Sequence, residues 1–273
     1  MKFNVVTVNY NSSHETVMML ESLVSELNYI NKIIIVDNSS DKKNVDLLKD
    51  NNVLNEQSSI VSLIFLDENI GYFPALNVGL SHLDDSDKNN EYTIICNNDL
   101  VFNHEFFSRL LDSSYPEHTF AISPSVKTIN GVYQNPSMAK KPSKTRLFFY
   151  SVYYSNYHVG KLLLKIWRKL GFGIDSNTKK DLQKREIFIG IGAIYVLAPV
   201  FFNKFKCLDY PLFLYGEEAF FSHQISSAGG CIFYDPTIEV LHLESVSTKK
   251  IPSRKNYDLN AKAFEIYKDY FKK

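Results

Sequence analysis

The sequence has few cysteines, no long hydrophobic run and no net charge. Its three cysteines, Cys96, Cys207 and Cys231, are an odd number without metal-site spacing, which argues against a disulfide framework and favours a reducing cytoplasm. No apolar run approaches the roughly 18 residues that a spanning helix needs. The N-terminus enters a strand pattern directly instead of showing a signal peptide. We therefore expect a cytoplasmic protein.

Four apolar runs, each followed by polar residues, predict the strands of a central sheet. They cover residues 3–8, 33–36, 61–66 and 93–96. Near-continuous runs that are rich in β-branched residues and bounded by turn residues are typical of strands buried on both faces. The pattern therefore favours a parallel sheet.

Helical patterns lie between these runs. Ser12 and Glu15 have the spacing of a capping box before an apolar stripe that extends to Leu27. Further helices are expected over residues 42–51 and 73–83. Alternation of strand and helix builds βαβ units with right-handed crossovers. We predict an α/β protein with a mostly parallel central sheet and helices on both faces.

The polar residues that follow the strands are candidates for a binding site. Asn97, Asn98 and Asp99 come directly after the fourth run. In α/β sheets, ligands bind in the crevice beyond the carboxyl ends of the strands. A carboxylate there can hold a divalent cation, and the cation can hold a diphosphate. A polar turn that merely closes the strand is the alternative.

Several motifs, taken in order, carry a resemblance to a known family. They are residues 7–11 (Thr-Val-Asn-Tyr-Asn), 36–40, 69–72, 75–79, 97–99, 213–218 (Phe-Leu-Tyr-Gly-Glu-Glu) and 240–242. This series resembles the family 2 glycosyltransferases with the GT-A fold, over residues 1–135 and 187–248. Within the family it looks most like the branch that builds bacterial surface polysaccharides, including rhamnosyl- and galactofuranosyltransferase-like members.

The resemblance implies a role for each motif residue. The positions implied to contact the nucleotide sugar are Thr7, Asn9, Asp37, Asn69, Asn77 and Asn98, and those implied to bind Mn²⁺ or Mg²⁺ are Asp99, Asn97 and His242. The pair Glu217-Glu218 is similar to the family's base motif, with the base at the second position, Glu218. The sequence departs from the family where Asn97 replaces an acidic residue, and where the base motif is Glu-Glu although Glu-Asp is commoner.

Most of these residues also have a purely structural explanation. Asp37 would cap the following helix, Asn69 would belong to a turn, and Asn77 would lie on a helix surface. His242 follows an apolar run and would be a satisfied core histidine, although imidazole also suits Mn²⁺. Carboxylates at a helix N-terminus are favourable in any case. The sequence leaves these alternatives open.

The second half is expected to carry the acceptor side. Residues 187–197 predict one glycine-punctuated strand, in which missing side chains allow close approach of a ligand or backbone. Glu217 and Glu218 open a predicted helix that ends at Gly229-Gly230. We expect one GT-A domain over residues 1–273. Its segments would be a nucleotide-sugar-binding half (1–135), a basic aromatic insertion (136–186), an acceptor and catalytic half (187–248) and a C-terminal helix (249–273).

Residues 140–185 concentrate positive charge. They contain twelve basic residues against Asp175 and Asp181, a net charge of +10 that leaves −10 for the rest of the chain. Aromatic and aliphatic residues are interleaved with the basic ones, as in amphipathic helices on an anionic membrane surface. An insertion whose apolar face packs on the core is the competing interpretation. Because no recognised nucleic-acid motif accompanies the charge, we expect no nucleic-acid partner.

Together with these features, the family resemblance implies an inverting glycosyltransferase. It would move a sugar from a nucleotide-sugar donor to a glycan or lipid-linked saccharide acceptor in bacterial surface polysaccharide synthesis, with Glu218 as the base. Its location would be peripheral on the inner face of the plasma membrane if residues 140–185 bind lipid. A non-catalytic nucleotide-sugar-binding or scaffold protein is the alternative that Asn97 and the Glu-Glu pair suggest. A sugar nucleotidyltransferase is less favoured, because no glycine-rich phosphate loop bearing Lys or Arg lies near the N-terminus.

Overall fold

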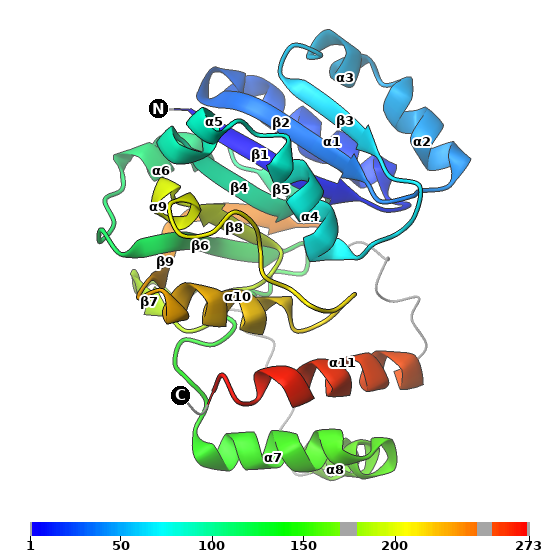
Figure 1. The fold of residues 1–273 in the computed structure, drawn as a ribbon, viewed down its shortest axis with the longest axis vertical. Helices are drawn as coiled ribbons and strands as arrows, with labels where there is room; N and C mark the ends of the chain where they lie inside the picture. The colour runs from blue at the N-terminus through cyan, green and yellow to red at the C-terminus, as the bar shows by residue number, and fades with distance from the viewer. Residues whose placement is uncertain (1, 170–178, 245–252, 272–273) are drawn as a thin grey trace.

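The computed structural model describes residues 2–169, 179–244 and 253–271 (Figure 1). The described residues form a sheet of nine strands: β1 (Phe3–Asn9), β2 (Ile30–Asp37), β3 (Val61–Phe65), β4 (Tyr92–Asn97), β5 (Leu100–Phe102), β6 (Thr119–Thr128), β7 (Arg185–Ile187), β8 (Ile194–Leu197) and β9 (Cys231–His242). The helices are α1 (Ser13–Leu23), α2 (Lys42–Lys49), α3 (Asn52–Glu56), α4 (Tyr72–Ser81), α5 (Asp85–Asn90), α6 (Phe106–Asp112), α7 (Lys144–Ser155), α8 (Tyr157–Lys169), α9 (Pro199–Phe202), α10 (Glu217–Ser227) and α11 (Ser253–Tyr267), with a 3₁₀ turn, η1 (Val24–Tyr29), after α1.

The strands have the order β3-β2-β1-β4-β8-β6-β9-β5, and β7 pairs with β9. The first four in this order are mutually parallel, and β6 and β9 share their direction. Only β5, β7 and β8 of the described strands run the other way. The predicted α/β fold with a mostly parallel sheet is confirmed. Parallel neighbours end together, so the polar ends of β1, β2 and β4 lie at one edge.

The central strands are buried on both faces, as their continuous apolar runs predict. Phe3 and Val5 of β1 pack with α1 and α6 in one core, whereas Val6 and Val8 pack with α4 and α10 in a second core on the opposite face. Gly79 brings α4 very close to the sheet, because a Cβ at that position would lie 2.4 Å from Val6 Cγ1. Helices therefore cover both faces of the sheet (Figure 1).

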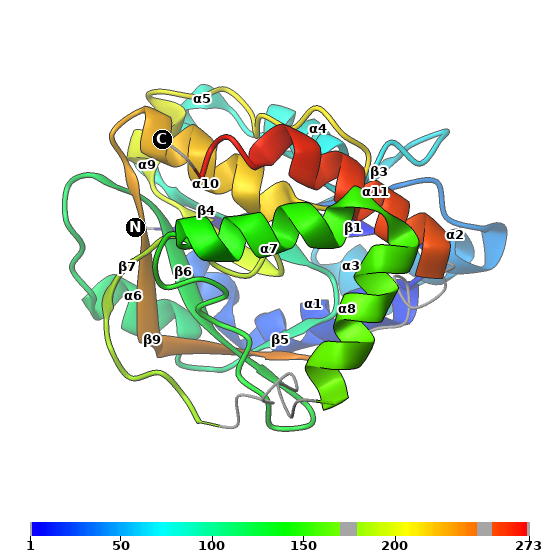
Figure 2. The ribbon, with the colours of Figure 1, turned by 90° about the horizontal axis from the view of Figure 1, so that it is seen from below.

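A further layer of helices, α11, α7 and α8, lies outside α10 (Figures 1 and 2). Leu147 of α7 is buried with Ala219 of α10 and with Phe271, which follows α11. The ring of Tyr154 on α7 stacks 4.9 Å from that of Phe264 on α11. The predicted C-terminal helix is α11, and residues 249–252 and 272–273 of that prediction lie outside the described residues. No described helix is both long enough and apolar enough to cross a membrane.

Three sequence predictions change in detail. The single strand predicted over residues 187–197 is wrong, because β7 ends at Ile187 and pairs with β9, whereas β8 begins at Ile194 and pairs with β4 and β6. The helix predicted over residues 42–51 ends at Lys49, and the short α3 follows it. Ser12 is the N-cap of α1, but its side chain makes no capping bond. Its hydroxyl joins a tertiary polar cluster instead, so tertiary contacts override the local capping pattern.

Candidate functional site

The carboxyl ends of several strands bring the predicted site residues to one edge of the sheet. In the strand register, Asn9 lies opposite Asp37, and Val8 lies opposite Asn97. The backbone amide of Asn97 donates to the carbonyl of Ala193 (2.8 Å), which places the start of β8 at the same edge. The end of β9 joins them because β5, directly after β4, pairs with it.

Asp99 and His242, two of the predicted metal ligands, face each other. Asp99 Oδ1 lies 3.2 Å from His242 Nε2, and both side chains are largely buried. His242 Nδ1 lies 2.7 Å from Gln134 Oε1. Gln134 keeps that oxygen toward the ring because its Nε2 donates to Glu244 Oε1 (3.2 Å). Nδ1 therefore donates to Gln134, and Nε2 faces the carboxylate.

The donor chemistry of this pair fits a divalent ion. A ligating histidine commonly donates its other ring N–H to an oxygen, which fixes its tautomer, and Gln134 provides that oxygen here. A carboxylate oxygen and an imidazole nitrogen together suit Mn²⁺. Asn97, the third predicted ligand, is half-buried, and its backbone amide is engaged with Ala193.

Asn9 and Asn98 form the centre of a buried polar cluster behind this edge. The Asn9 amide donates to Asp37 Oδ2 (2.6 Å), and its Oδ1 accepts from Thr16 Oγ1 (2.9 Å) and from Asn98 Nδ2 (3.2 Å). Asn98 Nδ2 also lies 2.7 Å from Ser12 Oγ. Both amides therefore hold the N-terminus of α1 against the strand ends, and Asn9 is completely buried.

Thr7 and Asp37, two other predicted nucleotide contacts, are also bonded within the protein. Thr7 is fully buried and donates to the carbonyl of Cys96 (2.9 Å), which links β1 to β4. Asp37 accepts from the backbone amide of Ser40 (2.9 Å) and so shapes the turn after β2. The helix cap that Asp37 would have supplied is instead Asp41, whose side chain accepts from the amide of Asn44. Nucleotide contact by Thr7, Asn9, Asp37 and Asn98 stays a prediction.

Asn38, which sequence reasoning missed, fixes the loop before α4. Its Nδ2 donates to Asn69 Oδ1 (3.0 Å) and to the Gly71 carbonyl (3.1 Å), and its Oδ1 accepts from the amide of Ile70 (3.0 Å). Gly71 has φ +95°, and a Cβ there would lie 2.3 Å from the carbonyl oxygen of Phe213. Asn69 is thus held at the end of β2, next to the chain that leads to α10.

Asn77 lies away from the cluster that surrounds Asn9. Its Nδ2 donates to the carbonyl of Leu208 (2.9 Å), and its Oδ1 accepts from the amide of the same residue (2.8 Å). This two-point contact fastens α4 to the segment between α9 and α10. Nucleotide contact by Asn77 stays a prediction, and the observed bonds give it a structural role.

The two candidate bases have different surroundings at the N-terminus of α10. Glu217 is buried and accepts from the amide of Tyr215 (2.9 Å). Burial, with the nearby charge of Glu218, raises the pKa of Glu217 to about 7. Glu218 is half-buried, and its Oε1 accepts from the amide of Gly192 (3.2 Å). A Cβ on Gly192 would lie 2.9 Å from that oxygen, so the glycine makes room for the carboxylate.

Tyr72 lies between the strand ends and the start of α10, near acidic residues of both. Its hydroxyl is buried and has no hydrogen-bond partner among the described residues. Burial raises the pKa of Tyr72 well above its usual value, and neighbouring acidic groups raise it further, namely Cys96, Asp99, Glu217 and Glu218. Asp99, a predicted metal ligand, and the two candidate bases Glu217 and Glu218 therefore all lie near Tyr72. The next residue, Phe73, is buried in the core.

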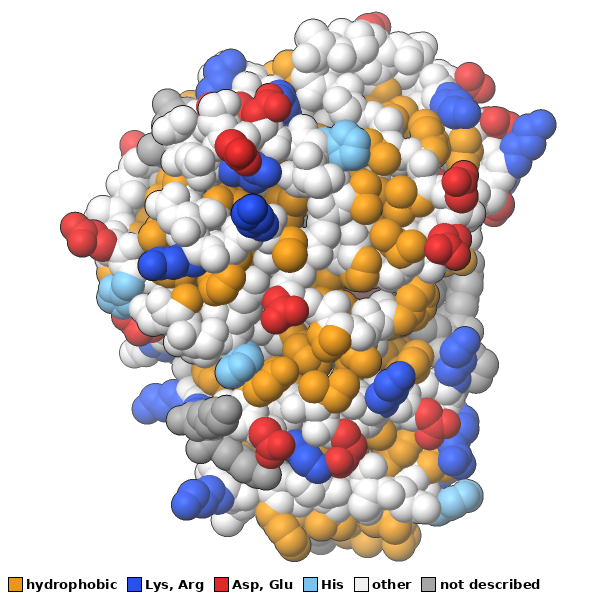
Figure 3. Space-filling view, viewed as in Figure 1, with side chains coloured by type: hydrophobic (Ala, Val, Ile, Leu, Met, Phe, Trp, Pro, Cys, Tyr) orange, Lys and Arg blue, Asp and Glu red, His pale blue; other side chains and the backbone are white. Residues whose placement is uncertain are grey.

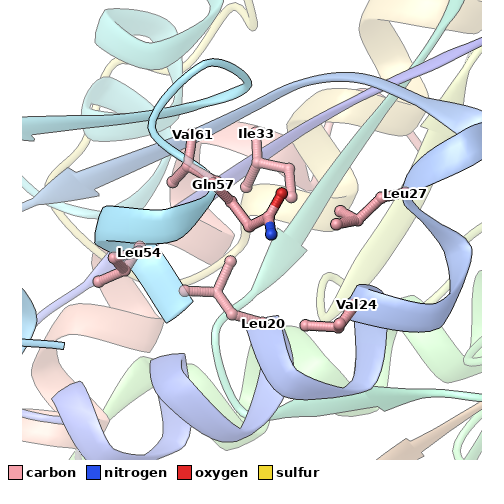
Figure 4. A pocket seen from close by; sticks show the side chains of 7 residues that line it. All are labelled: Leu20, Val24, Leu27, Ile33, Leu54, Gln57 and Val61. Carbon is pink, nitrogen blue, oxygen red and sulfur yellow. The ribbon is translucent and has the colours of Figure 1, made fainter. Parts of the chain in front are cut away.

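Two other features of the described residues lie elsewhere. A small hollow is lined by Leu20, Val24, Leu27, Ile33, Leu54, Gln57 and Val61 (Figure 4). It holds none of the predicted site residues. A second group of potential metal donors consists of His118, Glu186 and Cys231. Cys231 is the first residue of β9, whereas His242 is the last residue of that strand. Ten strand residues lie between these two ends, so the second group is separate from the site at the strand ends.

A family comparison identifies the chain. The model described as Glycosyl transferase family 2 matches residues 4–177, which is more than half of the 273 residues. The chain belongs to glycosyl transferase family 2. No curated protein sequence matches it.

Solved structures agree with this family 2 member in fold. GalNAc-T7, crystallised with UDP, GalNAc and Mn²⁺, gives a TM-score of 0.64 at 14% identity and covers 99% of this chain. The mannosyltransferase PcManGT of Pyrobaculum calidifontis, in complex with GDP-Man and Mn²⁺, gives 0.57 at 14% identity over 96%. S. aureus TarS gives 0.55 at 15% identity over 90%. The chain spans 50%, 69% and 37% of these proteins, respectively. At such identities the likeness is one of fold.

The sequence motifs identified most of the strand-end residues of this family 2 member, but not the residues that hold them in place. Asn38 stands next to Asp37 in a recognised motif, so its place at a strand end could have indicated a role. No local sequence pattern identifies Gln134, because it lies 108 residues from His242 in the chain and contacts it only in the folded structure.

Proposed function

We propose that this family 2 member transfers a sugar from a nucleotide-sugar donor to a hydroxyl of a glycan or lipid-linked saccharide, with inversion at the anomeric carbon. The observation that carries the proposal is the meeting of two groups at one edge of the sheet. Asp99 with His242 forms one group, and Glu217 with Glu218, beside Gly192, forms the other. Such a pairing suits a reaction that stabilises a leaving diphosphate and deprotonates an acceptor.

In this proposal the donor lies along the carboxyl ends of β1, β2 and β4. Asp37 and Asn69 would meet the nucleoside from the turn after β2 and the loop before α4. Asn9, Asn98 and Thr7 would hold these loops from behind, since their side chains are already bonded within the protein. Two of the similar structures contain Mn²⁺, one with UDP and one with GDP-Man, which supports a nucleotide-sugar donor.

Asp99 and His242 would hold Mn²⁺ or Mg²⁺, with Asn97 beside them. Once bound, the ion would neutralise charge on the departing diphosphate. Gln134 would hold the His242 ring with Nε2 turned toward the ion site, because its Oε1 accepts a hydrogen bond from the Nδ1 N–H. The role of the chain here is to present two fixed donors of suitable chemistry.

Glu218 would act as the general base. It is the more exposed of the two glutamates, and its position is fixed by the amide of Gly192. As the acceptor oxygen bonds to the anomeric carbon, the bond from that carbon to the diphosphate breaks, and the acceptor proton passes to Glu218. Glu217 would support the turn at Tyr215. No covalent intermediate with the protein is required, which makes the outcome inversion.

The finer assignment follows the family resemblance. We propose that the acceptor is a glycan or lipid-linked saccharide of a bacterial surface polysaccharide, and that the donor sugar belongs to the rhamnosyl or galactofuranosyl class. A non-catalytic nucleotide-sugar-binding protein remains the second candidate, because Asn97 occupies the first acidic position of the metal motif.

A donor panel tests the proposal. The protein is mixed with UDP-, dTDP- and GDP-sugars, with Mn²⁺, with Mg²⁺ or with EDTA, and the released products are measured. Slow release of nucleoside diphosphate that requires the metal supports the transferase. Donor binding without turnover supports the binding protein and overturns the transferase. Release of pyrophosphate would instead indicate a nucleotidyltransferase.

Paired variants test the base. Glu218→Gln should lower kcat far more than donor affinity, because a base acts in the transition state. Glu217→Gln, the matched control with the same change of atoms, should be milder. If acceptor-dependent kinetics rank the two variants the other way, the base is Glu217.

A further inference from the structure

The chain around α7 and α8 lacks acidic residues entirely. Between Glu117 and Asp175 the sequence contains no Asp or Glu, whereas it contains nine basic residues. The exposed basic residues of the two helices are Lys144, Arg146, Lys161, Lys165 and Lys169. This surface is therefore positive with no carboxylate of its own to neutralise it.

The outward faces of the same two helices carry large apolar side chains. Phe148 and Phe149 of α7 are 65% and 57% exposed, and Leu162 and Trp167 of α8 are 58% and 53% exposed. Leu164 and Ile166 are exposed as well. Figure 3 shows hydrophobic side chains along the lower end of the molecule, where Figure 1 has α7. Exposed apolar clusters of this kind mark interaction sites.

The inward face of this helix pair is already satisfied by the protein. Leu147 and Tyr154 of α7 pack toward α10 and α11, and burial raises the pKa of Tyr154 to about 12. Tyr257 of α11 donates to the carbonyl of Tyr153 (2.7 Å). The helices thus have one face packed on the molecule and another that presents aromatic and aliphatic groups between basic ones. The two interpretations that the sequence left open apply to opposite faces of the same helices.

We propose that the outer face of α7 and α8 docks on an anionic lipid bilayer. Helices that lie in a membrane interface combine Lys and Arg with Trp, Phe and Leu in this way, and their apolar face is buried to a depth of about 5–10 Å. The charge complementarity is what selects lipid over a second copy of this chain, because two copies would bring like charges together.

The docked face lies one to two helix layers, on the order of 10–20 Å, from the proposed base. Gly216 precedes Glu217, and a Cβ there would lie 2.9 Å from Tyr267 of α11. Leu147 of α7 packs in one cluster with Ala219, which lies in the first turn of α10. Packed helices lie about 8–10 Å apart. An acceptor hanging from a lipid carrier would therefore be presented near Glu218. This last consequence rests on the proposed function, whereas lipid docking does not.

The single tryptophan of the chain, Trp167, provides the measurement. The full protein, without substrates, is mixed with phosphatidylcholine vesicles with or without phosphatidylglycerol, and tryptophan emission and co-sedimentation are followed. With anionic vesicles only, we expect a blue shift of the emission, quenching by brominated acyl chains and co-sedimentation. Binding should weaken as salt shortens the Debye length from about 10 Å at 0.1 M to about 3 Å at 1 M.

Matched variants locate the surface. Lys161→Gln, Lys165→Gln and Lys169→Gln together should weaken binding about 100-fold, since each surface lysine contributes about fivefold. The same three changes at Lys42, Lys43 and Lys49 of α2, at the far end of the molecule, should have little effect (Figure 1). Phe148→Ser with Phe149→Ser should also weaken binding, whereas Leu47→Ser on α2 should not.

Three results would overturn the docking proposal. They are the absence of binding, binding that ignores lipid charge and salt, and a concentration-dependent dimer that shields Trp167 without lipid. Because the assay contains no sugar donor, its failure leaves the transferase proposal intact. Likewise, failure of the donor panel leaves lipid docking intact.

Discussion

Polar side chains at this edge of the sheet differ in how far their hydrogen-bonding groups are already engaged within the protein. The side chains of Asn9 and Asn98 form hydrogen bonds with each other and with the residues at the start of α1. Asp99 Oδ1, by contrast, lies 3.2 Å from the imidazole Nε2 of His242. Motifs of similar appearance in the sequence thus contain residues that hold the backbone and residues for which we propose a chemical role.

At the scale of the residue, Asp99→Asn should abolish metal-dependent turnover, with a loss of at least about 100-fold, because the amide removes the anionic donor. Asp99 is buried against His242, so we also expect a stability loss of about 1–3 kcal/mol. Mn²⁺-dependent donor hydrolysis and thermal unfolding measure the two effects. Asp46→Asn on the exposed side of α2 is the control. Wild-type activity in Asp99→Asn would refute the metal assignment.

Gln134→Ala gives a graded version of the same test. It leaves both proposed ligands in place and removes only the acceptor of the His242 Nδ1 proton. Outer-shell partners of this kind change metal affinity by about 10–100-fold. An unchanged Mn²⁺ requirement would show that Gln134 does not set the tautomer for metal binding.

At the scale of the element, helix and loop packing sets the position of the proposed base. The N-terminus of α10 is held from one side by the amide of Gly192 and from the other by α11 near Gly216. Likewise, α4 is fastened to the segment before α10 through Asn77. A change in any of these contacts should act on Glu218 without touching the donor.

Gly192→Ala should lower kcat by about 10–100-fold, because the added methyl group displaces Glu218 and small misplacements of a reacting group are costly. Donor affinity should stay within about twofold. In the double variant Gly192→Ala with Glu218→Asp, the shorter carboxylate has room for the methyl group and should recover part of kcat. Steady-state kinetics with a fixed acceptor measures both. If the double variant is no faster, the clash does not explain the loss.

Asn77→Ala should cost about 2 kcal/mol of stability, because both backbone groups of Leu208 lose their partner. If Asn77 is structural, donor affinity should be close to that of the wild type. Urea unfolding and donor titration separate the two effects, and Asn52→Ala on the exposed start of α3 is the control. A weaker donor affinity with unchanged stability would support the nucleotide contact that the family resemblance implies.

For the whole molecule, the buried carboxyl of Glu217 couples stability to pH. Its pKa in the folded protein, about 7, lies above the ordinary value of a glutamate, mainly because of burial. The folded state therefore binds this proton more tightly than the unfolded state. The resulting stabilisation is fully present below the ordinary pKa of glutamate and is lost as the pH rises through about 7.

We therefore expect the stability of Glu217→Gln to rise relative to the wild type between about pH 5 and about pH 8, by on the order of 2 kcal/mol. Chemical unfolding at a series of pH values measures this difference. Glu56→Gln, an exposed glutamate of α3, should show no such trend. A constant difference between the Glu217 variant and the wild type across this range would contradict the raised pKa.

The sequence by itself predicted the four parallel strands β1 to β4, the helices α1, α2, α4, α10 and α11, and the polar residues at the strand ends. Continuous apolar runs predict buried parallel strands because local hydrophobic pattern and β-branched content are properties of the chain itself. The motif order then fixed the family, and Asp99, His242 and Glu218 were named from it. The segment 187–197 was mispredicted, since its apolar pattern does not reveal that the chain leaves one strand partner for another at Gly190–Gly192.

Only the tertiary structure decided which polar side chains are engaged within the protein and which face the proposed binding site. The bond of Thr7 to Cys96 and the meeting of His242 with Gln134 join residues about ninety and more positions apart. No local pattern encodes such contacts, because they depend on how strands register and helices pack. The same holds for α7 and α8. Their composition was visible in the sequence, but packing against α11 selected which face stays in solvent, and with it the surface that we propose meets lipid.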